Sequence, residues 1–366
     1  MPKSDIIVIG GGIAGISAAS ALSDAAKVVV LEAEKSIGYH ATARSAAIYI
    51  KNYGNATLRA LNARSEAPLS VPALPVDAPI LTPRGELLIA QPDELDVFED
   101  YFQDSDGLER LSPRQAHDLV PILKTDMFCA AVYEPKAQDI DVDLLLAGYA
   151  RHARSNGADI ITNATVQQMR YDGCFWTIET TNGTYQAKIV INAAGAWGDH
   201  IAEIAGVTPL GLRPLRRSAV LMSLPNHLPC ENWPLFGSIT EQWYAKPMGG
   251  KLMISPADED PVQAQDVFPD DMTLAEGLWR FEQATTAPIA RPSHSWAGLR
   301  TFLPDRTPAV GFDANSDGFF WLVGQGGYGV QTSPAMSELA ADIILGNQPA
   351  IDQSHIAALS PHRFSQ

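Results

Sequence analysis

Short apolar runs that end in glycine, each followed by a helical pattern, occur near both ends of this chain. The first run covers residues 5–9 and leads into Gly10-Gly11-Gly12-Ile13-Ala14-Gly15, after which residues 16–24 have a helical pattern. The second covers residues 319–323, leads into a glycine-rich turn over 324–329, and precedes a helix predicted over 333–345. A short buried run that ends in glycine and opens a helix is typical of α/β proteins.

The central part of the chain alternates between helix-like and strand-like patterns. Residues 141–155 predict an amphipathic helix, and residues 86–90, 159–162, 166–171, 175–180 and 185–191 predict strands, with Asn182-Gly183 as a hairpin turn. An acidic helix is expected over 94–102, and a helix is expected to start at residues 44–47. The proline-rich stretch 68–83 should break any helix and connect two parts of the molecule, whereas residues 209–303 are β-like with few long helical runs.

Segments of nucleotide-binding type therefore occur at the start, middle and end of the chain. We expect an α/β (α+β overall) fold in which a Rossmann-like domain is interleaved with a β-sheet-rich substrate domain. The first domain is predicted to comprise residues 1–50, 141–208 and 301–366, and the second residues 51–140 and 209–300.

The first glycine turn has the full context of a dinucleotide-binding site. Gly10, Gly12 and Gly15 follow a strand and open a helix, and a second apolar strand, residues 28–31, ends on Glu32. The glycines allow close approach of a pyrophosphate to the helix N-terminus, and Glu32 can accept hydrogen bonds from both ribose hydroxyls. A 2′-phosphate would be repelled by that carboxylate.

Composition narrows the class of protein. The 366 residues suffice for about two domains, and 46% of them are hydrophobic. The formal net charge of −16 argues against nucleic acid and against anionic lipid as partners. No apolar run approaches the roughly 20 residues of a membrane span, and no secretory leader opens the chain, so we expect a soluble cytoplasmic protein. The three scattered cysteines and eight histidines show no metal-binding spacing, and no metal is expected.

The second glycine turn favours a flavin over a nicotinamide cofactor. A nicotinamide enzyme usually needs one fingerprint, whereas a second turn heading a C-terminal helix can hold the pyrimidine end of a flavin. The small residues from Asn192 to Gly195 likewise allow close backbone approach to a ligand.

With these segments in view, the chain resembles the D-amino-acid oxidase superfamily of flavoproteins, in the branch of glycine oxidase and sarcosine oxidase, and most of all bacterial D-arginine dehydrogenase. The resemblance runs nearly end to end through the glycine motif and Glu32, residues 39–47, 192–197 and 296–300, and 326–333. It implies FAD, held non-covalently because no cysteine lies near Gly298-Leu299-Arg300. The cofactor-binding residues it implies are Gly10, Gly12, Ile13, Ala14, Gly15, Glu32, Arg44, Ser45, Ala46, Ala47, Val166, Ala193, Gly195, Gly327, Gly329, Val330, Gln331 and Thr332.

A substrate carboxylate would be held best by arginine forks, for which Arg217 and Arg300 are candidates. Both match carboxylate-binding arginines of the resembled enzymes. By the same resemblance, Tyr53 and Tyr244 match substrate-facing tyrosines, and Glu86 matches an acid that contacts a cationic side chain. His294 is expected to be structural.

The pocket departs from D-arginine dehydrogenase at several positions. Ile48-Tyr49-Ile50 stands where that enzyme has His-Tyr-Thr, and Leu235 and Gly237 differ in size from the expected residues. We therefore expect a cavity that is more apolar on one wall and roomier on another. Broad specificity should follow, with D-arginine no longer dominant.

The resemblance implies FAD-dependent oxidation of free D-amino acids, with the Cα hydrogen leaving as hydride to flavin N5 and the imino acid hydrolysing to a 2-oxo acid and ammonia. The alternative is a sarcosine- or glycine-type oxidase or dehydrogenase of secondary amines. A non-catalytic flavin-binding protein and a nicotinamide dehydrogenase are weaker alternatives. The sequence leaves open the electron acceptor, whether quinone, another carrier or O2, and the oligomeric state.

Overall fold

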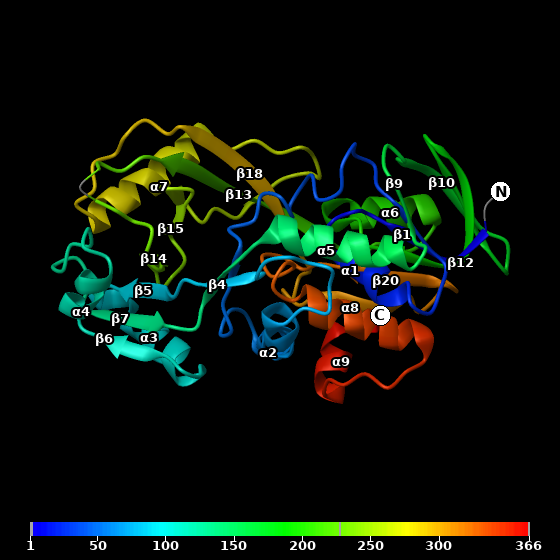
Figure 1. Ribbon diagram of the computed structural model, residues 1–366, viewed down its shortest axis with the longest axis horizontal. Helices are drawn as coiled ribbons and strands as arrows, with labels where there is room; N and C mark the ends of the chain where they lie inside the picture. Colours follow the sequence, from blue (N-terminus) through cyan, green and yellow to red (C-terminus); the bar gives the residue numbers. More distant parts are fainter. Residues whose placement is uncertain (1–2, 227, 365–366) are drawn as a thin grey trace.

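Two large β-sheets lie towards opposite ends of the long axis of the molecule (Figure 1). The computed structural model describes residues 3–226 and 228–364. The first sheet has eight strands and the second has nine, and a small three-stranded sheet completes the described strands.

The first sheet has the order β10-β11-β12-β1-β2-β9, with β20 paired to β12 and β19 paired to β20. The pairs from β12 through β1 and β2 to β9 are parallel, as is β12 with β20, whereas β10, β11 and β12 form an antiparallel meander. The strands are β1 (Lys3–Ile9), β2 (Val28–Leu31), β9 (Asp159–Ile161), β10 (Val166–Tyr171), β11 (Trp176–Thr180), β12 (Gly183–Asn192), β19 (Ala309–Phe312) and β20 (Phe319–Val323).

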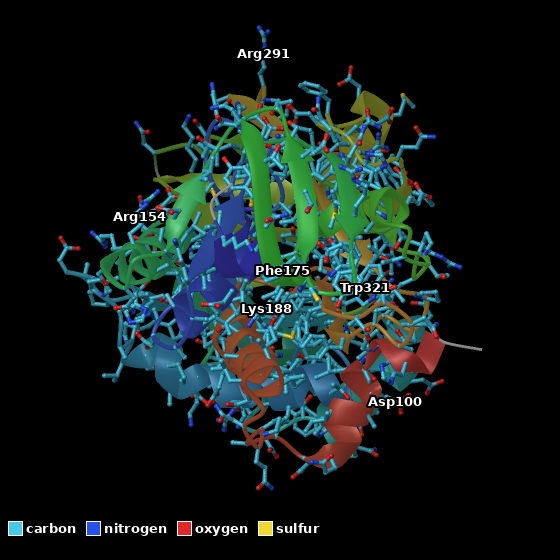
Figure 2. The ribbon with its side chains drawn as sticks, turned by 90° about the vertical axis from the view of Figure 1, so that its right-hand side faces the viewer. Asp100, Arg154, Phe175, Lys188, Arg291 and Trp321 are labelled. Carbon is cyan, nitrogen blue, oxygen red and sulfur yellow. The ribbon has the colours of Figure 1, made fainter. Side chains whose placement is uncertain are left out.

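Both faces of this sheet are buried, which explains why its central strands are continuously apolar. Ile6 and Val8 of β1 pack into one hydrophobic core with the helices α1 (Ile13–Leu22), α5 (Val142–Ser155) and α8 (Ser333–Leu345). Ile7 and Ile9 point the other way, into a second core with Trp321 and α6 (Gly198–Ala205). Figure 2 views the molecule from this end, with the antiparallel strands in front and Arg291 extending outward at the top.

The second sheet has the order β17-β13-β16-β15-β14-β5-β7-β6, with β18 paired to β13. A core that includes Phe236, Trp243 and Phe281 lies beneath α7 (Asp271–Ala284) and α4 (Pro113–Leu119), and Phe98 of α3 (Leu95–Gln103) packs in a smaller cluster. The strands are β5 (Glu86–Ala90), β6 (Glu109–Leu111), β7 (Ala130–Glu134), β13 (Arg213–Met222), β14 (Leu235–Ser238), β15 (Tyr244–Met248), β16 (Lys251–Ser255), β17 (Asp260–Pro261) and β18 (His294–Phe302).

The small sheet joins β3 (Ile48–Tyr49), β8 (Gln138–Ile140) and β4 (Leu81–Pro83) in that order. The helix α2 (Ala56–Ser70) packs against α8 and against α9 (Gln353–Leu359). Short 3-10 turns cover Pro92–Glu94, Gly195–Trp197 and Pro361–Phe364. No helix in the described ranges combines the length and the apolar character that crossing a membrane requires.

The expected α/β fold is confirmed, and most of the predicted elements are present. The helices over 141–155 and 333–345 and the strands at 86–90, 166–171 and 319–323 lie where the pattern placed them, to within a residue. The predicted hairpin joins β11 and β12, with Thr180 paired to Gly183. The acidic helix is α3, one residue later than expected.

Three local expectations are wrong. Residues 41–44 form a turn and residues 45–47 have no regular structure, so no helix starts there, and Ala47 has a φ of 56°. The helix α2 continues through Pro68, which lies in its last turn, so the proline-rich stretch does not exclude helix from its first residues. The 14-residue helix α7 was not anticipated in the β-like region.

Strands of the first sheet come from three separate stretches of the chain, and strands of the second sheet come from the stretches between them. This arrangement agrees with an interleaved organisation. The exact boundaries between the two expected domains stay a prediction.

Candidate active site

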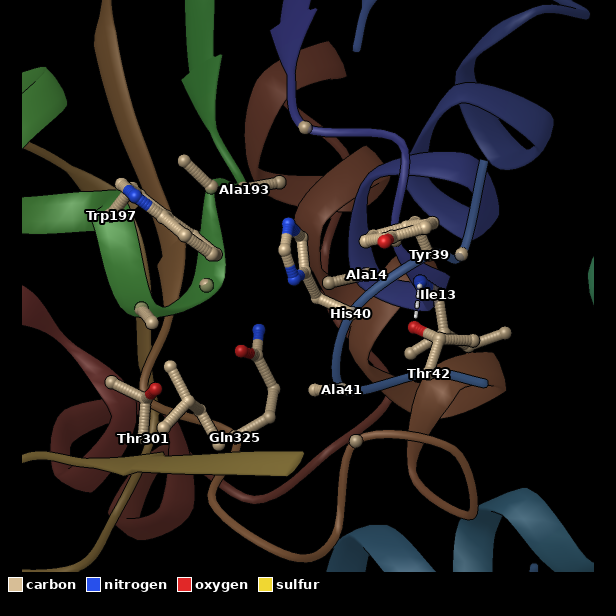
Figure 3. A pocket seen from close by; sticks show the side chains of 18 of the residues that line it. Ile13, Ala14, Tyr39, His40, Ala41, Thr42, Ala193, Trp197, Thr301 and Gln325 are labelled. Atoms are coloured by element: carbon tan, nitrogen blue, oxygen red, sulfur yellow. Dashed lines mark hydrogen bonds between the residues drawn. The ribbon is translucent and has the colours of Figure 1, made fainter. Parts of the chain in front are cut away.

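A cavity of about 530 Å³ brings together segments from both large sheets. The predicted residues that line it are Gly10, Gly12, Ile13, Ala14, Glu32, Arg44, Ser45, Ala46, Val166, Ala193, Gly195, Arg217, Tyr244, Arg300, Gly327, Gly329 and Val330. The predicted residues outside its lining are Gly15, Ala47, Tyr53, Glu86, Gln331 and Thr332. The chain has therefore gathered most of the expected positions around one space (Figure 3).

The first glycine turn forms a cradle in the lining of this cavity. A Cβ atom on Gly10, whose φ is 109°, would lie 2.4 Å from the carbonyl oxygen of Ala193, and one on Gly15 would lie 1.9 Å from the carbonyl oxygen of Gly10. Gly12, by contrast, faces open space, because a Cβ atom there would have only the Thr42 hydroxyl near it, at 3.4 Å. The turn therefore needs its outer glycines for packing, while Gly12 leaves room for a ligand.

Glu32 lies at the end of β2, beside the glycine turn. One carboxylate oxygen accepts a hydrogen bond from the Gly11 N–H at 2.6 Å, and the other accepts one from the Glu34 N–H at 2.8 Å. The side chain is fixed by these two bonds and still lines the cavity. Each carboxylate oxygen keeps acceptor capacity, which suits the hydroxyls of a ribose.

The loop after β2 crosses the N-terminus of α1. The Thr42 hydroxyl accepts a hydrogen bond from the Ile13 N–H at 3.0 Å, as Figure 3 shows, and so satisfies one free donor of the helix. Arg44 donates to the carbonyl oxygen of Ala297 at 3.0 Å and pairs with Asp266 at 2.5 Å. The guanidinium of Arg44 therefore fastens this loop to β18.

The second glycine turn forms another part of the lining, and a Cβ atom on its Gly329 would lie 3.7 Å from the Ile13 side chain of the first turn. Gly327, Gly329 and Val330 face the cavity, whereas Gln331 and Thr332 lie behind them, 3% and 0% exposed. The helix α8 begins directly after this turn, at Ser333. The positive end of the helix dipole therefore lies at this turn, and it favours negative charge on a ligand there.

Arg300 on β18 is the cation of this cavity that lacks a carboxylate partner. Its Nη1 donates to the Tyr53 hydroxyl at 3.2 Å, and it forms no ion pair within the part of the chain that the structure describes. Burial would lower the pKa of Arg300, but the Tyr53 and Tyr244 hydroxyls and Glu241 outweigh that effect and raise it. The guanidinium thus stays charged, with N–H groups free for an anion.

Arg217 lies on the strand next to Arg300. It pairs in register with Gly298, two residues before Arg300, so both arginines project from the same face of the sheet. The Arg217 Nε donates to the carbonyl oxygen of Asp258 at 2.8 Å, and Nη2 lies 3.2 Å from a carboxylate oxygen of Glu259. The arginine is oriented by these contacts and also lines the cavity.

The two predicted tyrosines approach Arg300 from different elements. Tyr244 begins β15 and lines the cavity. Tyr53 follows β3, and burial raises its pKa, so its hydroxyl stays protonated. This hydroxyl accepts a hydrogen bond from Arg300 and can donate one to Glu241, 3.5 Å away. Glu241 was missed by sequence reasoning because it belongs to the loop between β14 and β15, with no motif around it.

Glu86 lies on β5, outside the cavity lining. It pairs in register with Glu134 on one side and with Leu235 on the other. Burial, together with Glu134 and Glu241, raises the pKa of Glu86 well above its ordinary value. The raised pKa favours the neutral form of Glu86, which carries no charge for a cationic group.

The apolar substitutions expected to shape the pocket, at residues 48, 50 and 235, are also outside the lining. Gly237 does not enlarge the cavity either, because a Cβ there would lie 2.5 Å from the carbonyl oxygen of Trp243. This glycine permits close packing of β14 on β15. The expectation of a roomier wall at Gly237 is therefore wrong.

His40 is a further lining residue that sequence reasoning did not single out. Its ring lies between Trp197, at 4.5 Å between ring centroids, and Tyr39, at 5.0 Å, and Figure 3 shows it in the middle of the cavity. Its Nε2 lies 3.0 Å from a carboxylate oxygen of Glu34. The only signal in the sequence was its place in the segment 39–47.

These residues fit an FAD molecule. The cradle at Gly12 and the helix N-terminus suit a pyrophosphate, Glu32 suits the ribose, and the second turn before α8 suits an electron-rich ring. Arg300, Arg217 and Tyr244 line the same cavity and offer groups that can bind a small anion.

Comparison with known proteins gives consistent results. The family model of FAD dependent oxidoreductases matches residues 5–343. Glycine oxidase from Geobacillus kaustophilus is 26% identical over 248 residues, which cover 66% of this chain and 63% of that enzyme. Mitochondrial dimethylglycine dehydrogenase from Mus musculus is 24% identical over 70% of this chain, which corresponds to only 31% of its own length.

Solved structures show the same fold over the full chain. The crystal structure of glycine oxidase from Geobacillus kaustophilus superimposes with a TM-score of 0.85 at 21% identity and covers 99% of both chains. L-proline dehydrogenase from P. horikoshii has a TM-score of 0.86 at 22% identity, covering 100% of this chain and 99% of that one. The chain therefore belongs to the family of FAD-dependent oxidoreductases, and FAD is its cofactor.

Proposed function

We propose that this protein oxidises the C–N bond of a small amine that carries a carboxylate, such as a free or N-substituted amino acid. The observation that carries the proposal is Arg300, a charged guanidinium that faces the cofactor cavity without a carboxylate partner among the described residues. Burying such a charge is costly unless an anion joins it, and a substrate carboxylate matches its fork.

The side chains around Arg300 would orient the substrate. Arg300 and Arg217 project from one face of adjacent strands and would share the carboxylate, while Tyr53 and Tyr244 would limit the position of the amine. FAD, when bound, supplies the redox chemistry by accepting the electron pair and the hydrogen from the substrate carbon. Water then hydrolyses the imine product to an oxo compound and an amine or ammonia.

The substrate is either a D-amino acid or a secondary amine of the sarcosine and glycine type. The resemblance to D-arginine dehydrogenase favours the first. Glycine oxidase, dimethylglycine dehydrogenase and iminodiacetate oxidase among the similar proteins favour the second. A cationic side chain is the least favoured, because Glu86 lies outside the cavity lining and its pKa is raised by burial.

An anaerobic flavin-bleaching screen tests the proposal. The holoenzyme is mixed with glycine, sarcosine, N,N-dimethylglycine, iminodiacetate, and the D- and L-forms of alanine, methionine, leucine, phenylalanine, lysine and arginine. We expect bleaching by at least one carboxylate-bearing amine and none by the corresponding amines that lack the carboxylate. Equal bleaching by methylamine and by its carboxylated analogue would contradict the role of Arg300.

The same screen separates the two candidate classes. Faster bleaching by D-alanine or D-methionine than by sarcosine would favour D-amino acids, and the reverse would favour secondary amines. A hundredfold preference corresponds to a free-energy difference of about 2.8 kcal/mol. A preference for D-arginine above this level would indicate that Glu86 is ionised in the substrate complex. If no amine in the screen bleaches the flavin of the holoenzyme, the proposal is contradicted and the protein binds flavin without this activity.

A further inference from the structure

The turn from Ile50 to Tyr53 delivers the tyrosine that contacts Arg300, and buried side chains rather than a neighbouring strand hold its backbone. The turn is closed by the Tyr53 N–H, which donates to the carbonyl oxygen of Ile50 at 3.4 Å. The Lys51 N–H donates instead to a carboxylate oxygen of Glu134 at 2.9 Å. Most of the remaining backbone partners in this turn come from two amides, Asn62 and Gln331.

Asn62 on α2 is fully buried and reaches three carbonyl groups of the turn. Its side-chain nitrogen lies 3.3 Å from the Ile50 oxygen, 3.2 Å from the Lys51 oxygen and 2.9 Å from the Tyr53 oxygen. Two amide hydrogens are shared among these three acceptors. Loss of this group would take this donor away from the partly buried Lys51 and Tyr53 carbonyls, whereas the Ile50 carbonyl would keep the Tyr53 N–H and Gln331 as donors.

Gln331 completes the network from the other side. Its side-chain oxygen accepts from the Ile50 N–H at 3.1 Å, and its nitrogen donates to the Asn62 side-chain oxygen at 2.7 Å and to the Ile50 carbonyl at 3.3 Å. Gln331 directly follows Val330, which lines the cofactor cavity. The amide pair therefore connects the cofactor-facing turn before α8 with the turn that carries Tyr53.

We propose that Asn62 and Gln331 act as a positioning pair that sets the strength of carboxylate binding at Arg300. The inference rests on the proposed function. Neither residue lines the cavity, so their effect passes through the Ile50–Tyr53 turn to the Tyr53 hydroxyl, 3.2 Å from Arg300. When the pair is broken, the turn loses its fixed geometry, and Tyr53 no longer holds the guanidinium in its binding orientation.

Two substitutions disrupt the hydrogen bonds of this pair with little change of shape. Asn62→Asp removes the amide hydrogens that the three carbonyls share, and Gln331→Glu removes the donor to Asn62 and to Ile50 while keeping an acceptor for the Ile50 N–H. The second change is the milder one. It keeps the inference testable if the first variant does not fold.

Tyr49→Phe is the matched control. The Tyr49 hydroxyl is buried nearby and donates to the backbone carbonyl of Asn62 at 2.9 Å, within α2 and not within the turn. Its removal costs a buried hydrogen bond of similar kind without releasing the turn. A merely structural effect would therefore appear in all three variants.

The experiment uses the FAD-loaded enzyme and propionate, a carboxylate that lacks the amine. The Kd of propionate is measured from the change in flavin absorption and by calorimetry, beside Tm and the kinetics of the best substrate, expressed per bound FAD. We expect both pair variants to raise the propionate Kd and the KM roughly tenfold, with a smaller fall in kcat. Tyr49→Phe should lower Tm but leave Kd and KM unchanged.

Two outcomes would overturn the inference. If the pair variants bind propionate as the wild type does while their Tm falls as in Tyr49→Phe, the pair is only structural, and the proposed function is unaffected. If the wild-type holoenzyme responds neither to propionate nor to any amine in the screen, the proposed function fails and this inference fails with it.

Discussion

The Arg300 guanidinium donates a hydrogen bond to the Tyr53 hydroxyl at 3.2 Å, although the two residues lie 247 positions apart in the sequence. Arg300 comes from β18 of the second sheet, and Tyr53 follows β3 of the small sheet. Their contact ties two elements together beside the cofactor cavity. It also leaves the rest of the guanidinium fork available to an anion.

Removal of Arg300 should abolish most of the activity. Arg300→Ala should cost about 2–5 kcal/mol of transition-state stabilisation, because a desolvated ion partner of the substrate is lost. This loss is measured as a fall in kcat/KM. Arg300→Lys should recover only part of this, since a point charge cannot reproduce the bidentate fork. Stopped-flow reduction of the flavin measures both, and wild-type rates in the two variants would exclude Arg300 from the site.

Glu259 should influence substrate affinity through Arg217. Its carboxylate accepts from Arg306 at 3.0 and 2.9 Å and lies 3.2 Å from Arg217. Glu259→Gln weakens both contacts and frees Arg217 to change orientation, so we expect KM to rise roughly three- to tenfold with a smaller change in kcat. Glu276→Gln, which breaks the exposed pair with Arg280, is the control and should leave KM unchanged. A KM that does not respond to Glu259→Gln would mean that Arg217 is held by Asp258 alone.

Glu32 should contribute to FAD retention. Glu32→Ala removes the carboxylate that the Gly11 and Glu34 N–H groups orient towards the cavity, so we expect FAD affinity to fall by about 1.5–3 kcal/mol. The ratio of flavin to protein absorption after dialysis measures the loss. Glu338→Gln, at an exposed pair with Arg64, should retain FAD as the wild type does. Full FAD occupancy in Glu32→Ala would show that the ribose is held elsewhere.

FAD should be bound non-covalently. Among the described residues, no cysteine lines the cavity: Cys129 and Cys174 are exposed, and Cys230 is buried in the core of the second sheet. Denaturation by acid or heat should therefore release all the yellow colour into the supernatant. Colour that stays with the precipitated chain would indicate a covalent bond to another side chain.

The buried Glu86 should make stability fall as pH rises. Burial and the neighbouring Glu134 raise its folded-state pKa well above that of the unfolded chain, so between the two values the folded protein holds a proton that the unfolded chain has lost. In this window the free energy of unfolding decreases with increasing pH, and the stabilisation is complete only below the unfolded pKa. Glu86→Gln has no proton to lose. It should be more stable than the wild type near pH 8, and the difference should shrink towards pH 4. Urea unfolding at the two pH values measures this, and a constant difference would contradict the assignment.

Local sequence patterns predicted much of the fold because its main elements have strong local signals. The glycine turn at residues 10–15 follows a strand and opens a helix, which is the context typical of a dinucleotide site. The helix α5 has an apolar face and an Asp141 N-cap, and α8 has Pro334 in its first turn and Gly346 as its C-cap. The pattern failed for α2 and α7. In α2 the proline at position 68 lies in the last turn, and the helix continues past it to Ser70. The helix α7 has a mixed composition, and its Met272 and Trp279 are exposed to solvent.

For the candidate site, the sequence by itself determined the parts that are local. The two glycine turns and Glu32 at the end of β2 are legible from residue type and spacing, because each acts through its own backbone context. Arg217 and Arg300 were candidates from residue type and from the resemblance to known flavoenzymes, and the structure placed them on adjacent strands. Only the tertiary structure decided which groups meet. Glu241 and Glu259 approach Tyr53 and Arg217 from loops without a motif, and Glu86 is excluded from the cavity lining by its pairing between β14 and β7. Charge pairing and burial depend on distances between segments that are remote along the chain, and those distances exist only once the sheets have packed.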